Sequence, residues 1–113
     1  MTLEETLKRI DTFNKDRDWD QFHTPDSLAK SISIEAGELL ECFQWEGDYH
    51  KKSSAEQEHI LEELADVLNY GLQMCLTLNV NPCDIINQKI DKNALKYPVE
   101  KAKGKADKYN QLK

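Results

Sequence analysis

Apolar residues return every three or four positions through four long segments of this 113-residue chain. Successive residues of an α-helix are about 100° apart, so this spacing gathers the apolar side chains on one face of each segment. No segment alternates apolar and polar residues with the period of two that is typical of a half-buried strand. The sequence therefore predicts an all-α fold built as a four-helix bundle.

Start and stop signals divide the chain into these helices. Thr2 with Glu5, and Ser54 with Gln57, fit the capping box, in which two side chains satisfy free N–H groups at a helix start. Proline is expected to open the second and fourth helices, where its missing N–H costs nothing. The other expected boundaries are the loop 16–25, Thr24-Pro25, Gly47, Pro82 and Tyr97-Pro98.

The length of the chain allows one modest domain and not two independent cores. Residues 99–113 are rich in lysine and nearly free of apolar side chains, so we expect a domain over 1–98 and a frayed tail over 99–113. The formal net charge of -6 argues against non-specific binding to nucleic acid, which requires a basic surface. No apolar run approaches the ~20 residues that span a bilayer, so we expect no membrane partner and a cytoplasmic location.

The cysteines give no sign of zinc or of disulfides. Cys42, Cys75 and Cys83 are odd in number and form no CxxC pair. We therefore expect reduced thiols in or near the core.

The apolar face of the second helix carries an acid. Positions 28, 32, 35 and 39 lie nearly in one line on a helix, and position 35 is glutamate. Glu38 follows three residues later, and Glu63 with Asp66 repeats this spacing beside the apolar face of the third helix. If the two helices pack antiparallel, four carboxylates meet where desolvation and repulsion penalise uncompensated charge. No basic residue lies on these faces, so a hard divalent cation, Mg²⁺ or Mn²⁺, is the simplest compensator.

Two other interpretations of the acidic residues stay open. An isolated ExxE is usually a solvated helix face, and Glu41 and Glu62, which lie further around their helices, are interpreted in this way. Glu56-Gln-Glu-His59 also matches the Glu-x-x-His element of ferritin-like di-iron bundles. Such bundles need this element on two helices, and this sequence has one copy.

The acidic residues also carry a family resemblance. Glu35-Ala-Gly-Glu38 followed by Glu63-Leu-Ala-Asp66 resembles the ExxE…ExxD signature of the all-α, MazG-like nucleoside triphosphate pyrophosphohydrolases. The resemblance covers about residues 10 to 98, because consecutive blocks look like those of the dCTP pyrophosphatase branch. These blocks are FNKDRDWDQFH (13–23), EAGELLECFQW (35–45), EELADVLNY (62–70) and KIDKNALKYP (89–98).

The resemblance implies an enzyme that cleans the nucleotide pool. It implies hydrolysis of a nucleoside triphosphate, such as dCTP or a modified deoxynucleotide, to the monophosphate and pyrophosphate. Glu35, Glu38, Glu63 and Asp66 would hold Mg²⁺, or Mn²⁺ in its place, and one of them would take the proton of the attacking water. The family also implies a homodimer or a dimer of dimers, which would complete the thin core of a short chain.

Three aromatic residues at family-like positions are candidates to enclose the base: Trp19, Phe22 and Trp45. A flat ring gains affinity by stacking on a base, and packing in the core is the alternative role for each. His23 is interpreted as a hydrogen-bonding residue of the loop.

Further contacts to sugar and phosphate are expected from Tyr70 on the third helix and from Lys89, Asn93 and Lys96 on the fourth. A solvated helix face is the alternative interpretation of these lysines. The chain departs from the dCTP branch at Ile10, where that branch has histidine, and at Ala94 and Leu95, which replace arginines. A strict preference for cytosine is therefore not expected.

Two alternative functions stay open. One is a catalytically silent helical module that senses nucleotide or mediates dimerisation. The other is a relative with the same chemistry that hydrolyses phosphoribosyl-ATP or dUTP.

Overall fold

Helices make up the chain, as expected, in a computed structural model that describes residues 1–106 and 110. No strand occurs among the described residues. The elements are α1 (Leu3–Asp16), α2 (Pro25–Glu41), α3 (Ser54–Leu78), α4 (Pro82–Lys96) and the short α5 (Val99–Ala102), with 3₁₀ turns η1 (Asp20–Phe22) and η2 (Tyr49–Lys51). The chain divides into two compact units, Met1–Asn79 and Val80–Lys113.

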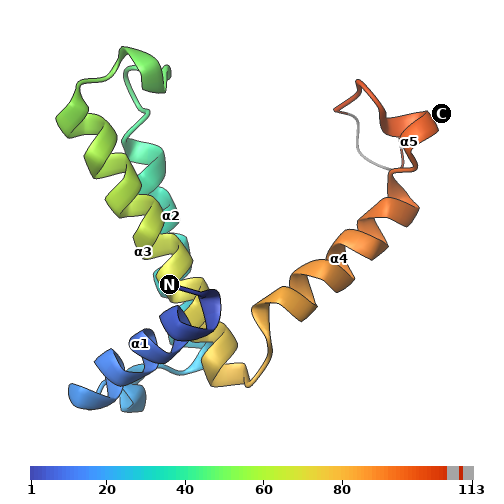
Figure 1. The fold of residues 1–113 in the computed structure, drawn as a ribbon. Helices are drawn as coiled ribbons and strands as arrows, with labels where there is room; N and C mark the ends of the chain where they lie inside the picture. The colour runs from blue at the N-terminus through green and yellow to red at the C-terminus, as the bar shows by residue number, and fades with distance from the viewer. Residues whose placement is uncertain (107–109, 111–113) are drawn as a thin grey trace. The chain divides into compact units, whose positions relative to one another are not determined.

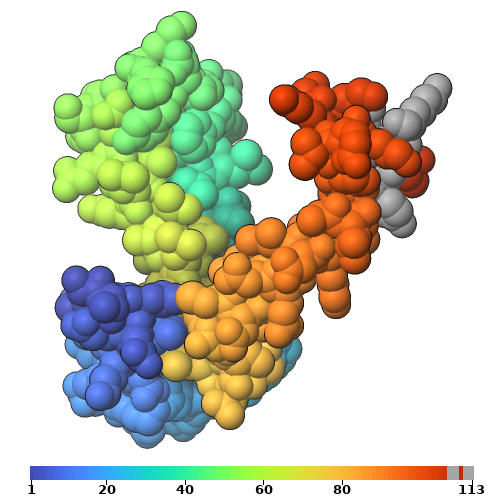
Figure 2. Space-filling model, turned by 45° about the vertical axis from the view of Figure 1, so that its right-hand side comes forward, coloured from blue at the N-terminus to red at the C-terminus, as the bar shows by residue number. Residues whose placement is uncertain are grey.

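The first unit is an antiparallel helix pair with a third helix across one end. α2 and α3 lie side by side along their lengths and are joined by the connection at residues 42–53 (Figure 1). α1 packs against α3 at the end of the pair that lies away from this connection, as the blue and green regions of Figure 2 show. The buried apolar residues of this unit are Leu28, Ile60 and Cys75. This apolar core is small. Polar side chains therefore also lie between α2 and α3.

The predicted apolar face of α2 includes the acid Glu35, as the helical spacing requires. Leu28 is fully buried, and Ile32, Glu35 and Leu39 are half-buried. The next residue, Ala36, is exposed, because it lies about 100° further around the helix than Glu35. Glu35 therefore occupies a core-facing position.

Both capping boxes were predicted, and one is displaced by a residue. Thr2 and Glu5 form the expected box at the start of α1. At α3 the box joins Ser53 to Glu56, so the prediction of Ser54 with Gln57 is wrong. Ser53 precedes Glu56 by the three residues that a box requires, and its hydroxyl accepts from the Glu56 N–H at 3.2 Å. Gln57 instead donates its side-chain amide to the Tyr49 carbonyl at 3.0 Å.

The second helix ends at Glu41, so the expected stop at Gly47 is wrong. After Leu39 the backbone bonds shorten to three-residue spacing, with Phe43 N–H donating to the Leu40 carbonyl at 3.0 Å. Such 3₁₀ bonds satisfy the last carbonyls of a helix without a glycine. The chain therefore leaves the helix about one and a half turns early.

Three further expectations concern the loop at 16–25, the cysteines and the lysine-rich tail. The loop at 16–25 contains the 3₁₀ turn η1, and Asp18 within it adopts φ 55°. Cys75 is buried and Cys42 half-buried, but Cys83 is exposed at the start of α4 and was wrongly expected in or near a core. Of the lysine-rich tail, residues 99–102 form α5, whereas 107–109 and 111–113 lie outside the described residues, so the expectation of a frayed tail stays a prediction.

The second unit is built on α4. The Asn81 side chain caps this helix by accepting from the N–H groups of Cys83 at 2.8 Å and Asp84 at 3.2 Å. The helix ends at Lys96, with Tyr97 as its C-cap directly before Pro98, where the sequence predicts the boundary. Within the described part of the chain, no helix combines the length and the apolar content needed to cross a membrane.

Candidate functional site

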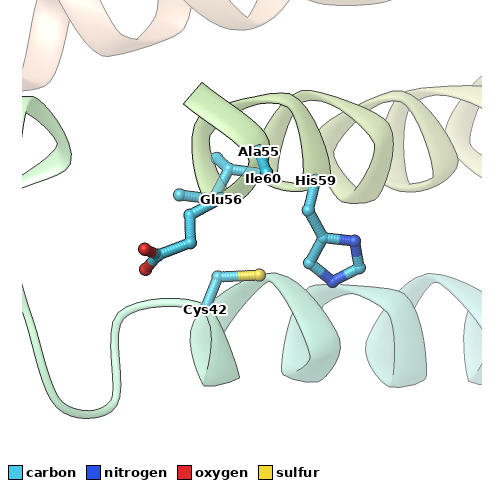
Figure 3. Close-up of a pocket in the computed structure, with 5 residues that line it drawn as sticks. All are labelled: Cys42, Ala55, Glu56, His59 and Ile60. Carbon is cyan, nitrogen blue, oxygen red and sulfur yellow. The ribbon is translucent and has the colours of Figure 1, made fainter. Parts of the chain in front are cut away.

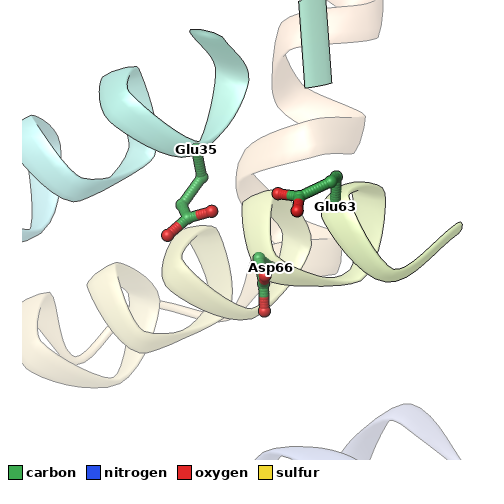
Figure 4. A group of neighbouring side chains, drawn as sticks. All are labelled: Glu35, Glu63 and Asp66. Atoms are coloured by element: carbon green, nitrogen blue, oxygen red, sulfur yellow. The ribbon is translucent and has the colours of Figure 1, made fainter. Parts of the chain in front are cut away.

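Three carboxylates from two helices converge in the first unit. Glu35 of α2 and Glu63 and Asp66 of α3 each offer an oxygen, and these oxygens all lie within 4.8 Å of one another (Figure 4). Glu63 and Asp66 share one side of α3 because they are three residues apart, and the antiparallel packing sets Glu35 opposite them. We call these three residues the acidic cluster.

The cluster is short of positive charge. Burial, followed by the hydrogen bond and the charge of the Glu38 carboxyl, raises the pKa of Glu35 from 4.5 to about 6. Burial also raises the pKa of Glu63, and Glu38 adds to that shift in the same two ways. His59 opposes the rise of the pKa of Glu63, with its Nε2 lying 3.5 Å from Oε1 of Glu63.

Two oxygens of the cluster have no hydrogen-bond partner among the residues that the structure describes. They are Oε2 of Glu35 and Oε2 of Glu63, and both atoms are buried. Buried oxygens in native proteins are normally satisfied, and a carboxylate without a partner is costly. All ligand atoms of the cluster are carboxylate oxygens, which suit hard cations such as Mg²⁺ and Mn²⁺. The residues present therefore fit a divalent metal ion.

A pocket of about 560 Å³ between α1 and α3 adjoins the cluster. Asp66 lines this pocket and also belongs to the acidic cluster, so the two features share a wall. We call it the α1–α3 pocket. Trp19, Phe13 and Tyr70 line it as well, as does Ile10.

Trp19 is held in place from two sides. Its backbone N–H donates to the Asn14 carbonyl at 2.9 Å, and its ring meets the ring of Phe13 edge to face at 5.7 Å. The guanidinium of Arg17 lies 3.6 Å from the centre of the Phe13 ring. The indole is nevertheless 43% exposed, so part of its surface is free to contact a ligand.

The structure does not bring every predicted residue to this pocket. Phe22 and Trp45 are 61% and 90% exposed, and neither lines it. Lys89, Asn93 and Lys96 lie on α4 in the second unit, so their positions relative to the acidic cluster stay a prediction.

The sequence interpretation missed three amide residues of the pocket wall: Asn14, Asn69 and Gln73. Asn14 and Gln73 are almost fully buried, 4% and 7% exposed. A signal was present in the sequence, because positions 66, 69 and 73 continue one face of α3 beyond the acids. Asn14 likewise falls at helical spacing from Leu7 and Ile10 on the apolar face of α1.

A second cavity, of about 380 Å³, lies at the other end of the helix pair. It is lined by Cys42, Ala55, Glu56, His59 and Ile60. In Figure 3 the Glu56 carboxylate and the His59 imidazole point to opposite sides of the Cys42 thiol. Glu56 is engaged in the capping box with Ser53, and it is not a member of the acidic cluster. This geometry gives no support to a di-iron interpretation of Glu56 and His59 within the described residues.

The fold and the cluster together define an all-helical protein whose acidic cluster fits a divalent metal ion and lies beside a pocket. Comparison with known proteins identifies the family. The MazG-like family matches residues 30–112, and the chain belongs to this family. The resemblance drawn from the sequence is thereby confirmed.

Individual relatives agree with this assignment. Over 115 aligned positions the chain is 36% identical to dCTP pyrophosphatase 1 of Mus musculus and 35% identical to that of Homo sapiens. Both alignments cover 98% of this chain and 68% of the relative. A crystal structure of a pyrophosphatase from Archaeoglobus fulgidus is similar in fold, with a TM-score of 0.71 and 41% identity over 85% of this chain and 92% of that one.

Proposed function

We propose that the chain is a nucleoside triphosphate pyrophosphohydrolase that depends on a divalent metal ion, most simply Mg²⁺. It hydrolyses deoxynucleotides such as dCTP, or modified forms of them, to the monophosphate and pyrophosphate, and so cleans the nucleotide pool in the cytoplasm. The relatives named dCTP pyrophosphatase 1 and the pyrophosphatase structure support the class of reaction. The observation that carries the proposal is the shared wall at Asp66 between the acidic cluster and the α1–α3 pocket.

This adjacency suits attack at the α-phosphorus. The α-phosphate is the phosphate nearest the nucleoside, so a base in the α1–α3 pocket leaves its α-phosphate beside Asp66. A metal ion bound by Glu35, Glu63 and Asp66 would neutralise charge on the phosphate oxygens and lower the pKa of a bound water. The water oxygen bonds to the α-phosphorus, the bond from that phosphorus to the bridging oxygen breaks, and pyrophosphate leaves.

The proton of the attacking water needs an acceptor. Glu38 is the fourth acid of the signature, and it lies close enough to Glu35 and Glu63 to raise the pKa of both. It is not one of the three residues whose oxygens lie within 4.8 Å of one another. We therefore assign to Glu38 the role of general base, together with support of the metal ligands.

The α1–α3 pocket takes the nucleoside in this proposal. Trp19 presents an exposed part of its ring to the base, and Tyr70 contacts the sugar or the α-phosphate from α3. Lys89, Asn93 and Lys96 contribute hydrogen bonds to the sugar and the phosphates, and Phe22 and Trp45 help to enclose the base. The active form is a homodimer or a dimer of dimers.

The test is hydrolysis of a panel of dNTPs and NTPs with Mg²⁺, with products separated by anion exchange. Wild-type protein should release monophosphate and pyrophosphate from at least one substrate, and EDTA should stop the reaction. Glu38→Ala should lower kcat/KM by about 100-fold or more while helicity is kept. Glu41→Ala, an exposed acid on the same helix, is the matched control and should keep its activity. Nucleotide binding by wild type without any turnover would instead indicate a sensor.

A further inference from the structure

We infer that Gln73, held by Asn69, selects the base by accepting a hydrogen bond from its exocyclic amino group. The inference rests on the proposed function, because it assigns the base to the α1–α3 pocket. It concerns residues that the acidic signature does not include. The observation that carries it is the side-chain oxygen of Gln73, a buried acceptor without a partner among the described residues. Gln73 lies in the wall of the α1–α3 pocket, about two helical turns beyond Asp66.

The side chain of Gln73 is buried and only half satisfied. It is 7% exposed and lines the α1–α3 pocket. Its Nε2 donates to Oδ1 of Asn69 at 3.1 Å, which fixes the orientation of the amide. Its Oε1 is buried and accepts no hydrogen bond from residues 1–106 or 110. Since buried acceptors in native proteins are nearly always paired, the missing donor is expected from a bound molecule.

The chemistry of the missing donor separates the bases into two groups. Cytosine and adenine present an exocyclic N–H₂ group, whereas uracil and hypoxanthine present a carbonyl at the same ring position. An N–H of the amino group satisfies Oε1 of Gln73. A carbonyl in its place leaves two acceptors facing each other without a proton. A buried site of this kind rejects the wrong partner strongly because the polar group of the protein stays unpaired.

The neighbouring residues offer further hydrogen-bonding groups to the base. Asn69 accepts through Oδ1, so its Nδ2 remains as a donor on the same pocket wall and suits the ring nitrogen next to the amino group. Asn14 lines the same pocket and carries the backbone carbonyl that holds Trp19. Asn14 thus adds an amide on the α1 side of the pocket, next to Trp19.

The test compares kcat/KM for dCTP and dUTP, which differ at this ring position. Gln73→Met keeps the size and the apolar stem of the side chain but removes the acceptor. The ratio of kcat/KM for dCTP to that for dUTP should fall about tenfold or more, through loss of dCTP turnover. Asn69→Ala, at an exposed residue, should shift the ratio in the same direction because Gln73 loses its orienting partner.

A matched control separates selection from stability. Gln57→Met makes the same change on α3 outside the pocket and breaks the bond to the Tyr49 carbonyl, so it should lower stability and leave the ratio unchanged. An unchanged ratio in Gln73→Met, or in Asn69→Ala if Gln73→Met does not fold, would overturn the inference while the proposed function stands.

The inference also has a test that needs no turnover. If wild type hydrolyses no triphosphate, the proposed function fails, and binding of dCMP and dUMP is then followed by tryptophan fluorescence. A preference of wild type for dCMP that is lost in Gln73→Met would support the assignment of Gln73. Equal binding of the two monophosphates by wild type would overturn it.

Discussion

Glu35 occupies a position on α2 where an apolar side chain would stabilise the helix pair. Its half-buried carboxyl faces Glu63 and Asp66, and its Oε2 has no partner. Such a residue lowers the stability of the metal-free protein, since charge is buried beside like charge. A bound cation would offset this repulsion. The stability that Glu35 removes from the metal-free protein is therefore a consequence of its proposed role in metal binding.

The raised pKa of Glu35 predicts an unusual pH dependence of stability. With a pKa near 6 in the folded state and 4.5 as its ordinary value, Glu35 binds more protons when folded than when unfolded between these values. Its contribution to stability is thus present below about pH 4.5 and is lost as the pH rises through 6. We expect the melting temperature in EDTA to fall over this window, and saturating Mg²⁺ to reverse the fall.

Glu35→Gln provides the control for that titration. The variant lacks the ionisable group, so its melting temperature in EDTA should change less between pH 4.5 and 7 than that of wild type. An identical fall in both proteins would show that other groups cause the pH dependence.

Glu63 should be essential for turnover and unfavourable for stability. Its side chain is 13% exposed, and its Oε2 is buried without a partner. Glu63→Gln should lower kcat/KM by about 100-fold or more and raise the melting temperature in EDTA, because it removes a buried charge. Glu62→Gln, at a neighbouring side chain that is 70% exposed, should change neither quantity appreciably. Comparable losses of activity in the two variants would count against the metal assignment.

The acids of the site were predictable at this scale, and the amides were not. Residues three apart on a helix share a face whatever the packing, so the pairing of Glu63 with Asp66 followed from the sequence. The burial of Asn14 and Gln73 depends on how α1 crosses α3, which no local spacing reveals. An isolated polar residue on an apolar helix face was a signal of a buried polar group. The sequence did not show which residues of the other helix lie beside it.

At the scale of the elements, the helices were predicted better than their ends. Helical spacing located α1 to α4 because each has a long apolar face. The end of α2 was missed because 3₁₀ bonds close it without a glycine. The start of α3 was missed by one residue because Ser53 and Ser54 are adjacent candidates for the same cap. Signals at helix ends are short, so neighbouring residues compete.

The two serines allow a direct test of the cap. Ser53→Ala removes the hydroxyl that accepts from the Glu56 N–H and should lower the free energy of unfolding by about 1 kcal/mol. Ser54→Ala lies inside α3 and should be neutral or slightly stabilising, since alanine favours helix. Urea denaturation of both variants measures the difference. A larger loss of unfolding free energy in Ser54→Ala than in Ser53→Ala would indicate that Ser54 is the cap, as the sequence suggested.

At the scale of the whole molecule, a single chain buries little apolar surface. Leu40, Leu61 and Leu68 are all more than half exposed, at 71%, 56% and 58%. On α4, Ile86 and Ile90 are 56% and 55% exposed. A short chain with so small a core is expected to gain its stability by self-association.

We predict an oligomer in solution. Light scattering coupled to gel filtration should give two or four times the 13.1 kDa of one chain at micromolar concentration. The melting temperature should rise with protein concentration, because association stabilises the folded state. A folded monomer with full activity would contradict this prediction. The assembly could not be deduced from local patterns, since these give apolar faces without their partners.

The most direct test of the account is hydrolysis of dCTP in ¹⁸O-labelled water with Mg²⁺. Attack at the α-phosphorus places the label in dCMP and leaves pyrophosphate unlabelled, and this is the result we predict for wild type. Turnover should disappear in Glu38→Ala and persist in Glu41→Ala. Release of dCDP with labelled phosphate would contradict the account, because it would place the attack at the γ-phosphorus, away from the wall that Asp66 shares with the α1–α3 pocket.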